Sequence, residues 1–258
     1  MSTTETQSLH RAIAILDCFR VGQPELGVRE IARQLELHPS TVGRMLATLA
    51  SLGILAQNKE THRYRMGAKV LNWGAVYISS VDLRVEARPY MEKLHQATNE
   101  TVSLYIPDGD ARVCIERLES SQMVRMVARV GERMPFYAGA SGKALLAFLP
   151  PDQQKAILKN VPLAKLTTNT IHDAKALIHE LALIQERGYA FSQGERVEGA
   201  SSVAAPIFNA TGRAIGAINI SGPSTRFSKP KIQEYAALLV EATAQISKAM
   251  GYLEKEPE

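Results

Sequence analysis

One stretch of the chain, residues 40–53, carries side chains that could read a nucleic acid. Thr41, Arg44, Thr48 and Ser51 follow one another at spacings of i, i+3, i+7 and i+10, so they would share one face of a helix. Short hydroxyl groups and a guanidinium can bond base edges and phosphate oxygens, and the N-terminus of a helix favours anions. The pattern therefore indicates a helix that lies in a groove of nucleic acid.

A shorter helix should precede this one and support it. Val28, Ile31, Ala32 and Leu35 fall on one helical face, which predicts a buried stripe. This helix should stop by His38, because the residue before a proline is pushed out of the helical region.

The second helix is expected to take Ser40 as its N-cap and to end at Gly53. Its inner face should be formed by four apolar residues, Val42, Leu46, Leu49 and Leu52. An earlier helix with the stripe Leu9, Ala12, Ile13, Leu16 and Phe19 should pack under both.

A small basic hairpin is expected to follow. Residues 54–58 and 63–66 alternate loosely and flank residues 59–62, which predicts a two-stranded wing. From His38 to Lys69 there are five basic residues and one acidic residue, a local charge of +4. An ordinary helical pair with solvated charges is the alternative, but charge so placed suits a phosphate backbone. We therefore predict a winged helix-turn-helix whose DNA-binding residues are Arg29, Ser40, Thr41, Arg44, Thr48, Lys59, Arg63 and Arg65.

A second candidate site begins at the run Gly139-Ala140-Ser141-Gly142-Lys143. Small residues at a helix start leave backbone N–H groups that can bind an anion. The run is not a phosphate-binding P-loop, because Tyr137 stands where its first glycine belongs and Ala144 replaces the residue that would hold Mg²⁺. A site for a small carboxylate and a plain helix cap both remain open.

Small polar residues also occur among apolar neighbours at 199–202 and 219–221, on expected adjacent strands. Buried hydroxyls and amides need partners, and a bound ligand could supply them. A hydrolase is the enzymatic alternative, but the sequence Gly-Ala-Ser-Ser-Val has no GxSxG nucleophile elbow. A pure protein-interaction module would leave the basic wing without a role.

Length and composition fit an intracellular, two-domain protein. The chain has 258 residues, 45% of them hydrophobic, and a net charge of +4, which permits nucleic-acid binding. We find no apolar run of ~20 residues and no secretion signal, so we expect a cytoplasmic protein with no membrane partner. Cys18 and Cys114 should be core residues, and the scattered histidines predict no metal. No cofactor is expected.

The rest of the chain should form a linker and an α+β domain. Residues 68–80, with Trp73, predict an apolar linker helix that pairs with a second copy, and Asp82 should cap the next helix. Strands are expected at 101–107, 111–119, 122–130, 189–193, 202–208 and 214–221, and helices at 141–149, 151–159, 173–187 and 228–253. Strands around a helical middle indicate an antiparallel sheet covered by helices.

Residues 9–19, VREIARQL, HPSTVGRMLATLASLGIL, YRMG and most of 188–223 resemble the isocitrate-lyase-regulator (IclR) family of bacterial transcription factors. The resemblance implies a winged helix-turn-helix at 1–67, linker and dimerisation helices at 68–98, and a GAF-like effector-binding domain at 99–258. It implies a ligand-responsive regulator of a catabolic operon, a repressor rather than an activator, that binds operator DNA as a dimer or tetramer.

The same resemblance indicates where the effector would bind. Relatives use the position of Ser202, often a cysteine, and an acidic residue at the position of Ser192. Together with the two polar stretches this predicts an effector site of Gly139, Ala140, Ser192, Ser202, Asn219 and Ser221. Because Ser192 carries no charge, we expect an aromatic, sugar-derived or short oxo acid.

Overall fold

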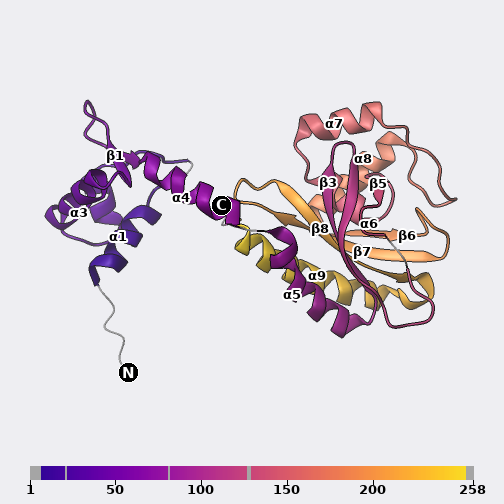
Figure 1. The fold of residues 1–258 in the computed structure, drawn as a ribbon. Helices are drawn as coiled ribbons and strands as arrows, with labels where there is room; N and C mark the ends of the chain where they lie inside the picture. Colours follow the sequence, from indigo (N-terminus) through magenta and orange to yellow (C-terminus); the bar gives the residue numbers. More distant parts are fainter. Residues whose placement is uncertain (1–6, 21, 81, 127–128, 254–258) are drawn as a thin grey trace, which may run out of the picture. The chain divides into compact units, whose positions relative to one another are not determined.

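The computed structural model describes residues 7–20, 22–80, 82–126 and 129–253, which fall into two compact units. The first unit is Met1–Ser80 and the second is Val81–Glu258 (Figure 1). Each has its own hydrophobic core. Among the described residues, no helix is long and apolar enough to cross a membrane.

The first unit is a three-helix bundle with a two-stranded wing and a further helix. Its elements are α1 (Gln7–Asp17), α2 (Val28–Gln34), α3 (Pro39–Ser51), β1 (Leu55–Gln57), β2 (Tyr64–Met66) and α4 (Ala68–Ser80). Strands β1 and β2 pair antiparallel, and Leu26 forms a bridge to Tyr64. The core contains Ile15, Ile31 and Leu46, all fully buried. The predicted winged helix-turn-helix is thus confirmed as a fold.

Three details of this unit differ from the sequence prediction. Leu9 and Ile13 of the expected stripe are exposed and α1 turns Ile15 into the core, whereas Leu16 and Phe19 of that stripe do pack against it. The N-cap of α3 is His38, whose Nδ1 accepts from the Ser40 N–H, while Pro39 takes the first helical position. Leu52 is 52% exposed because α3 ends at Ser51 and Leu52 is already its C-cap.

The second unit is built on one six-stranded antiparallel sheet in the order β5-β4-β3-β8-β7-β6. Its strands are β3 (Thr101–Asp108), β4 (Ala111–Leu118), β5 (Arg133–Pro135), β6 (Ala190–Gln193), β7 (Ala200–Phe208) and β8 (Ala214–Pro223). Its helices are α5 (Leu83–Thr98), α6 (Ala140–Ala147), α7 (Pro151–Asn160), α8 (Ala174–Arg187) and α9 (Lys229–Ala249), with a 3₁₀ turn, η1, at Ser224–Arg226.

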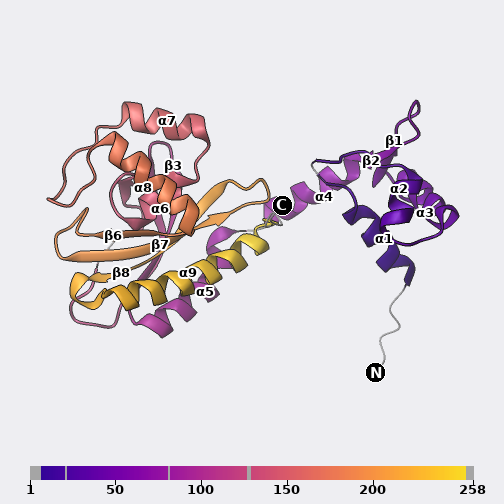
Figure 2. The ribbon, with the colours of Figure 1, turned by 180° about the vertical axis from the view of Figure 1, so that it is seen from behind.

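Helices cover both faces of the sheet. On one face α5 and α9 lie side by side and pack on Val102, Ile218 and Ile220 (Figures 1 and 2). On the other face α6 packs on the sheet, in the same core as Tyr105 and Ala217, and α8 packs against α6. Because side chains alternate along a strand, Asn219 and Ser221, two and four residues after Ala217 on β8, share this second face. The predicted helix-covered antiparallel sheet is confirmed.

Two boundaries of the sequence prediction change. The described part of 122–130 contains no strand, and the sheet continues instead with β5. Backbone groups of this segment bond side chains, since Met126 O accepts from Thr101 Oγ1 and Val124 O accepts from Arg226. In the expected linker segment 68–98, α4 belongs to the first unit, whereas α5 supplies core residues of the second. Asp82 caps α5 as predicted.

Candidate functional site

The outward face of α3 presents the predicted row to solvent. Arg44, Thr48 and Ser51 are exposed, and Thr41 is half-buried. The hydroxyl groups of Thr48 and Ser51 donate to Arg44 O and Thr48 O within the helix, so their lone pairs stay available to an outside donor. The Ser40 hydroxyl lies 2.7 Å from His38 Nδ1, where it helps to form the start of the helix. Arg44 is therefore the long, charged side chain that this row presents to solvent.

The basic residues around α3 divide into two kinds. Arg29, Lys59 and Arg65 are exposed, and no ion pair holds them among the described residues. Arg63 is different, because its Nη2 lies 2.8 Å from the Glu30 carboxylate and also donates to Glu25 O at 3.0 Å. Arg63 thus links the wing to α2. Counting the charged residues along the sequence could not show this interaction.

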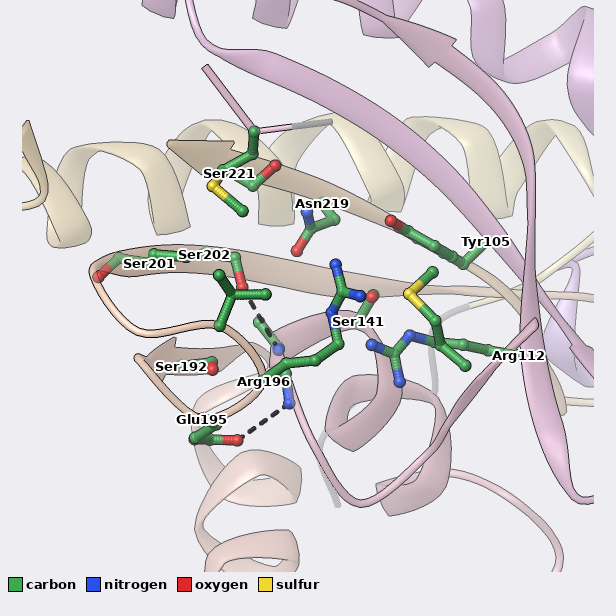
Figure 3. Close-up of a pocket in the computed structure, with 16 residues that line it drawn as sticks. Tyr105, Arg112, Ser141, Ser192, Glu195, Arg196, Ser201, Ser202, Asn219 and Ser221 are labelled. Atoms are coloured by element: carbon green, nitrogen blue, oxygen red, sulfur yellow. Dashed lines mark hydrogen bonds between the residues drawn. The ribbon is translucent and has the colours of Figure 1, made fainter. Parts of the chain in front are cut away.

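All six residues predicted for the effector site line one pocket of the second unit (Figure 3). The register explains how three of them meet: Ser192 on β6 is opposite Ser202 on β7, and Ser202 is opposite Ser221 on β8. Asn219, two residues before Ser221, points to the same face. The N-terminus of α6 supplies the residues Gly139 and Ala140. The enclosed free volume is about 50 Å³, room for a few water molecules.

The two backbone N–H groups predicted to be free are already engaged. Gly139 N–H donates to Glu195 Oε2 at 3.0 Å, and Ala140 N–H donates to Ser202 Oγ at 3.4 Å. The prediction that these two groups stand open to a ligand carboxylate was therefore wrong in this structure. The start of α6 does bind a carboxylate, but it belongs to the chain's own Glu195.

Glu195 also pairs with a buried lysine. Lys143 is 1% exposed, and its Nζ lies 2.5 Å from Glu195 Oε1, 2.8 Å from Phe191 O and 3.4 Å from Glu180 Oε1. A buried ammonium needs such partners. Lys143 stood within the glycine-rich run noted in the sequence, whereas Glu195 lies too far along the chain for any spacing to connect the two.

A second buried cation, Arg112, lines the pocket, and no carboxylate among the described residues forms an ion pair with it. Arg112 on β4 is 2% exposed and donates to Pro135 O and, at 2.9 Å, to Ala138 O. Its Nε has no hydrogen-bond partner among the described residues. Burial lowers the pKa of Arg112 to about 10, so the guanidinium is still charged at neutral pH. Its ring neighbour is Tyr105, with 5.5 Å between the guanidinium carbon and the ring centre.

Arg196 is the other arginine of the pocket. It follows Glu195 in the connection between β6 and β7, and its side chain extends across the pocket in the direction of Arg112 (Figure 3). Its only ion pair among the described residues is a long one, 3.6 Å to Glu132. The sequence analysis identified neither arginine as a pocket residue. The residues around Arg112 read as an ordinary strand, and those around Arg196 as an ordinary connection between strands.

Comparison with known proteins places this arrangement in a family. The model of the IclR helix-turn-helix domain matches residues 8–59, and that of the bacterial transcriptional regulator IclR C-terminal domain matches residues 75–248.

Relatives of known name match over almost the whole chain. The HTH-type transcriptional regulator KdgR of Escherichia coli K12 is 37% identical over 228 residues, which cover 88% of this chain and 87% of that protein. The HTH-type transcriptional repressor AllR of the same strain is 34% identical over 245 residues, 95% of this chain and 90% of that one.

Solved structures agree with the sequence matches. An IclR transcriptional regulator from Silicibacter sp. TM1040 superposes with a TM-score of 0.84 and 26% identity over 95% of this chain and 96% of that chain. The repressor BlcR of Agobacterium tumefaciens superposes with a TM-score of 0.77 and 28% sequence identity, over 98% of this chain and 100% of that chain. With both domain models matched, in order, on the winged helix-turn-helix and on the sheet that forms the pocket, the chain belongs to the IclR family of bacterial transcriptional regulators.

Proposed function

We propose that this regulator represses a catabolic operon in the cytoplasm, and that a small organic acid bound in the pocket of the second unit changes its affinity for operator DNA. The observation that carries the proposal is the meeting of Gly139, Ala140, Ser192, Ser202, Asn219 and Ser221 at one pocket. Those residues come from four separate elements. Family membership and the name of AllR, a repressor, support the sign of regulation.

The DNA contact we propose is made by α3 and the wing. Arg44 and Thr41 would approach base edges in the major groove, with Thr48 and Ser40 beside them. Lys59 and Arg65 on the wing, and Arg29 on α2, would contact phosphates. Arg63 would act mainly by holding the wing in place, since the Glu30 carboxylate occupies part of its guanidinium.

An organic acid suits the pocket because polar groups and positive charge form part of its wall. Its lining includes Arg112 and Arg196 together with the serines and Asn219, and Glu195 is already paired with Lys143. A small ligand with carboxylate and oxygen groups could replace water in such a space.

We also propose that the protein works as a dimer or tetramer, because a recognition helix normally reads one half of a two-fold site. On α4, Leu71 is 76% and Trp73 is 49% exposed. Large apolar side chains exposed on one helix are typical of a surface that pairs with another chain.

One experiment tests the proposed function. The purified full chain is titrated in a gel shift against the DNA upstream of its own gene, alone and with pyruvate, gluconate and 4-hydroxybenzoate, one acid of each expected class. We expect a specific complex that at least one acid weakens. No specific complex, or complexes that all three acids leave unchanged, would argue against the proposal.

A further inference from the structure

Two guanidinium groups, those of Arg112 and Arg196, line the effector pocket, and the carboxylate among its lining residues, Glu195, is already bonded to Lys143. Arg112 has no ion pair among the described residues, and Arg196 has only the 3.6 Å contact to Glu132. Like charges repel each other, and besides burial the charge of Arg196 lowers the pKa of Arg112, while Glu195 and Glu132 act in the opposite direction. A bound anion would remove that repulsion.

The alternative place for an anion, the start of α6, is occupied by the chain itself. Glu195 Oε2 accepts from Gly139 N–H, and Glu195 Oε1 lies 2.5 Å from the buried Lys143 Nζ. A ligand carboxylate could enter there only by displacing an internal carboxylate from two donors. The positive charge that internal carboxylates compensate least therefore lies at the arginines and not at the helix start.

Two buried polar atoms in the pocket wall lack a partner in the described part of the chain. Arg112 Nε is a donor, and Asn219 Oδ1 is an acceptor; their residues are 2% and 5% exposed. Buried polar groups are normally paired, so each atom indicates the complementary group of a ligand. Arg112 Nε requires an acceptor, which an anion provides best. Asn219 Oδ1 requires a donor, which a neutral hydroxyl can provide.

We propose that Arg112 and Arg196 together receive the carboxylate of the effector while Asn219 Oδ1 accepts from one of its hydroxyl groups, so that the effector is a hydroxylated carboxylic acid. This inference rests on the proposed function and narrows it. Arg112 is held in place by Pro135 O and Ala138 O, so it forms the fixed half of the anion site. Arg196 lies on a connecting loop and is the half that can adjust to the size of the ligand.

The test uses three molecules of similar size that separate charge from hydroxyl groups. D-Glycerate has both, propionate has only the carboxylate, and glycerol has only hydroxyls. Titration calorimetry on the full chain at low salt should show binding of glycerate, at least tenfold weaker binding of propionate, and none of glycerol. Equal affinity for glycerol and glycerate, or no binding of glycerate, would overturn the proposal.

Variants assign the binding to the arginines. Arg112→Gln and Arg196→Gln should each weaken glycerate binding at least tenfold, and Arg112→Lys should recover part of the loss because it restores the charge. Arg213→Gln is the matched control, since Arg213 is exposed and its Nη2 donates to Gln153 Oε1, away from this pocket. Circular dichroism checks that each variant is folded, and Arg196→Gln decides the matter if Arg112→Gln is not.

The outcomes separate this inference from the function on which it rests. If an organic acid alters operator binding equally in the wild type and in both glutamine variants, the proposed function stands and the arginine site is wrong. If glycerate binds through the arginines but neither glycerate nor any other acid affects DNA binding, the site stands and the proposed regulation is wrong.

Discussion

Arg44 and Arg63 lie in the same DNA-binding unit but have different surroundings. The Arg44 side chain is exposed on the outer face of α3, and only its backbone carbonyl is engaged by a side chain, that of Thr48. Arg63 is half-buried and bonded to Glu30 and Glu25. A charged residue with free donors can exchange water for a base or phosphate, whereas one that is already paired must first give up its partner.

Replacing Arg44 should therefore affect DNA binding without affecting the fold. We expect Arg44→Ala to weaken operator binding by about 1–3 kcal/mol and to relax specificity at the base it contacts. Fluorescence anisotropy with operator DNA and with single-base variants measures both effects. Arg213→Ala, which removes the same charge from the other unit, should bind as the wild type does. A folded Arg44→Ala protein with full affinity would exclude α3 from the groove.

The pKa of the Glu30 carboxyl group reflects in part the ion pair with Arg63 that links the wing to α2. A hydrogen bond from Gly27 N–H, and after it the bond from Arg63, lower the pKa of Glu30 below 4.5. Since the folded state favours the ionised form, this contribution to stability is present above pH 4.5 and is lost as the pH falls through the lowered pKa. NMR titration of the Glu30 carboxyl carbon should show the low value directly.

Arg63→Ala should raise the pKa of Glu30 only part of the way to 4.5, because Gly27 N–H, the larger cause, remains. In Glu30→Gln, the stability of the first unit should fall less as the pH is lowered, because the carboxyl group that would be protonated is missing. An unchanged pKa in Arg63→Ala would show that the ion pair does not form in solution.

At the scale of elements, the order of helices and strands followed largely from periodicity and turn residues. The hairpin turn at Gly109 has a positive φ of 62°, and Asn209 Oδ1 accepts from the backbone of the later turn. The sequence predictions were wrong where two local structures fitted the sequence equally well and tertiary contacts decided between them. On α1, either Ile13 or Ile15 could face inward, and packing against α3 selected Ile15. Segment 122–130 has strand composition, but its carbonyls bond side chains instead.

The site was predictable only as far as short motifs and family resemblance reached. Six residues of the pocket were named from the sequence, and the sheet and the start of α6 bring them together. Arg112, Glu195 and Arg196 were not, because their roles depend on contacts between residues 23 or more positions apart, such as Arg112 with Pro135. Such contacts leave no local pattern in one sequence.

Close packing at the start of α6 leads to a prediction about stability. A Cβ added at Gly142 would clash with Phe136 O and Arg112 Nη1. Gly142→Ala should therefore destabilise the second unit by about 1–3 kcal/mol through overpacking. Hydrogen exchange, which resolves the two units separately, measures the effect.

Gly43→Ala is the matched control. Gly43 lies inside α3, and its nearest contact for an added Cβ is Val28 Cγ1 at 3.8 Å. An alanine there should stabilise the first unit by about 0.5–1 kcal/mol through helix propensity. Equal effects of the two substitutions would mean that the contact between α6 and residue 136 is looser than described.

At the scale of the whole molecule, self-association should depend on α4. Leu71 is 76% exposed in the single chain, so Leu71→Glu should leave the fold unchanged while placing a charge in the proposed contact between copies. Sedimentation analysis should show a shift toward monomer and, with it, weaker operator binding. Lys155→Glu, an exposed change on α7, serves as the control. An unchanged mass in Leu71→Glu would place the dimer contact elsewhere.

The central claim is that an acid bound in one compact unit changes the DNA affinity of the other. The most direct measurement is the dissociation constant for upstream DNA, by fluorescence anisotropy, with and without glycerate, pyruvate, gluconate and 4-hydroxybenzoate, for the wild type and Ala140→Leu. Because Ala140 lies in the pocket wall and outside the DNA-binding unit, the variant should bind DNA normally. We predict that at least one acid weakens binding by the wild type tenfold or more and leaves Ala140→Leu unaffected; an equal response of both proteins, or none from either, would contradict the account.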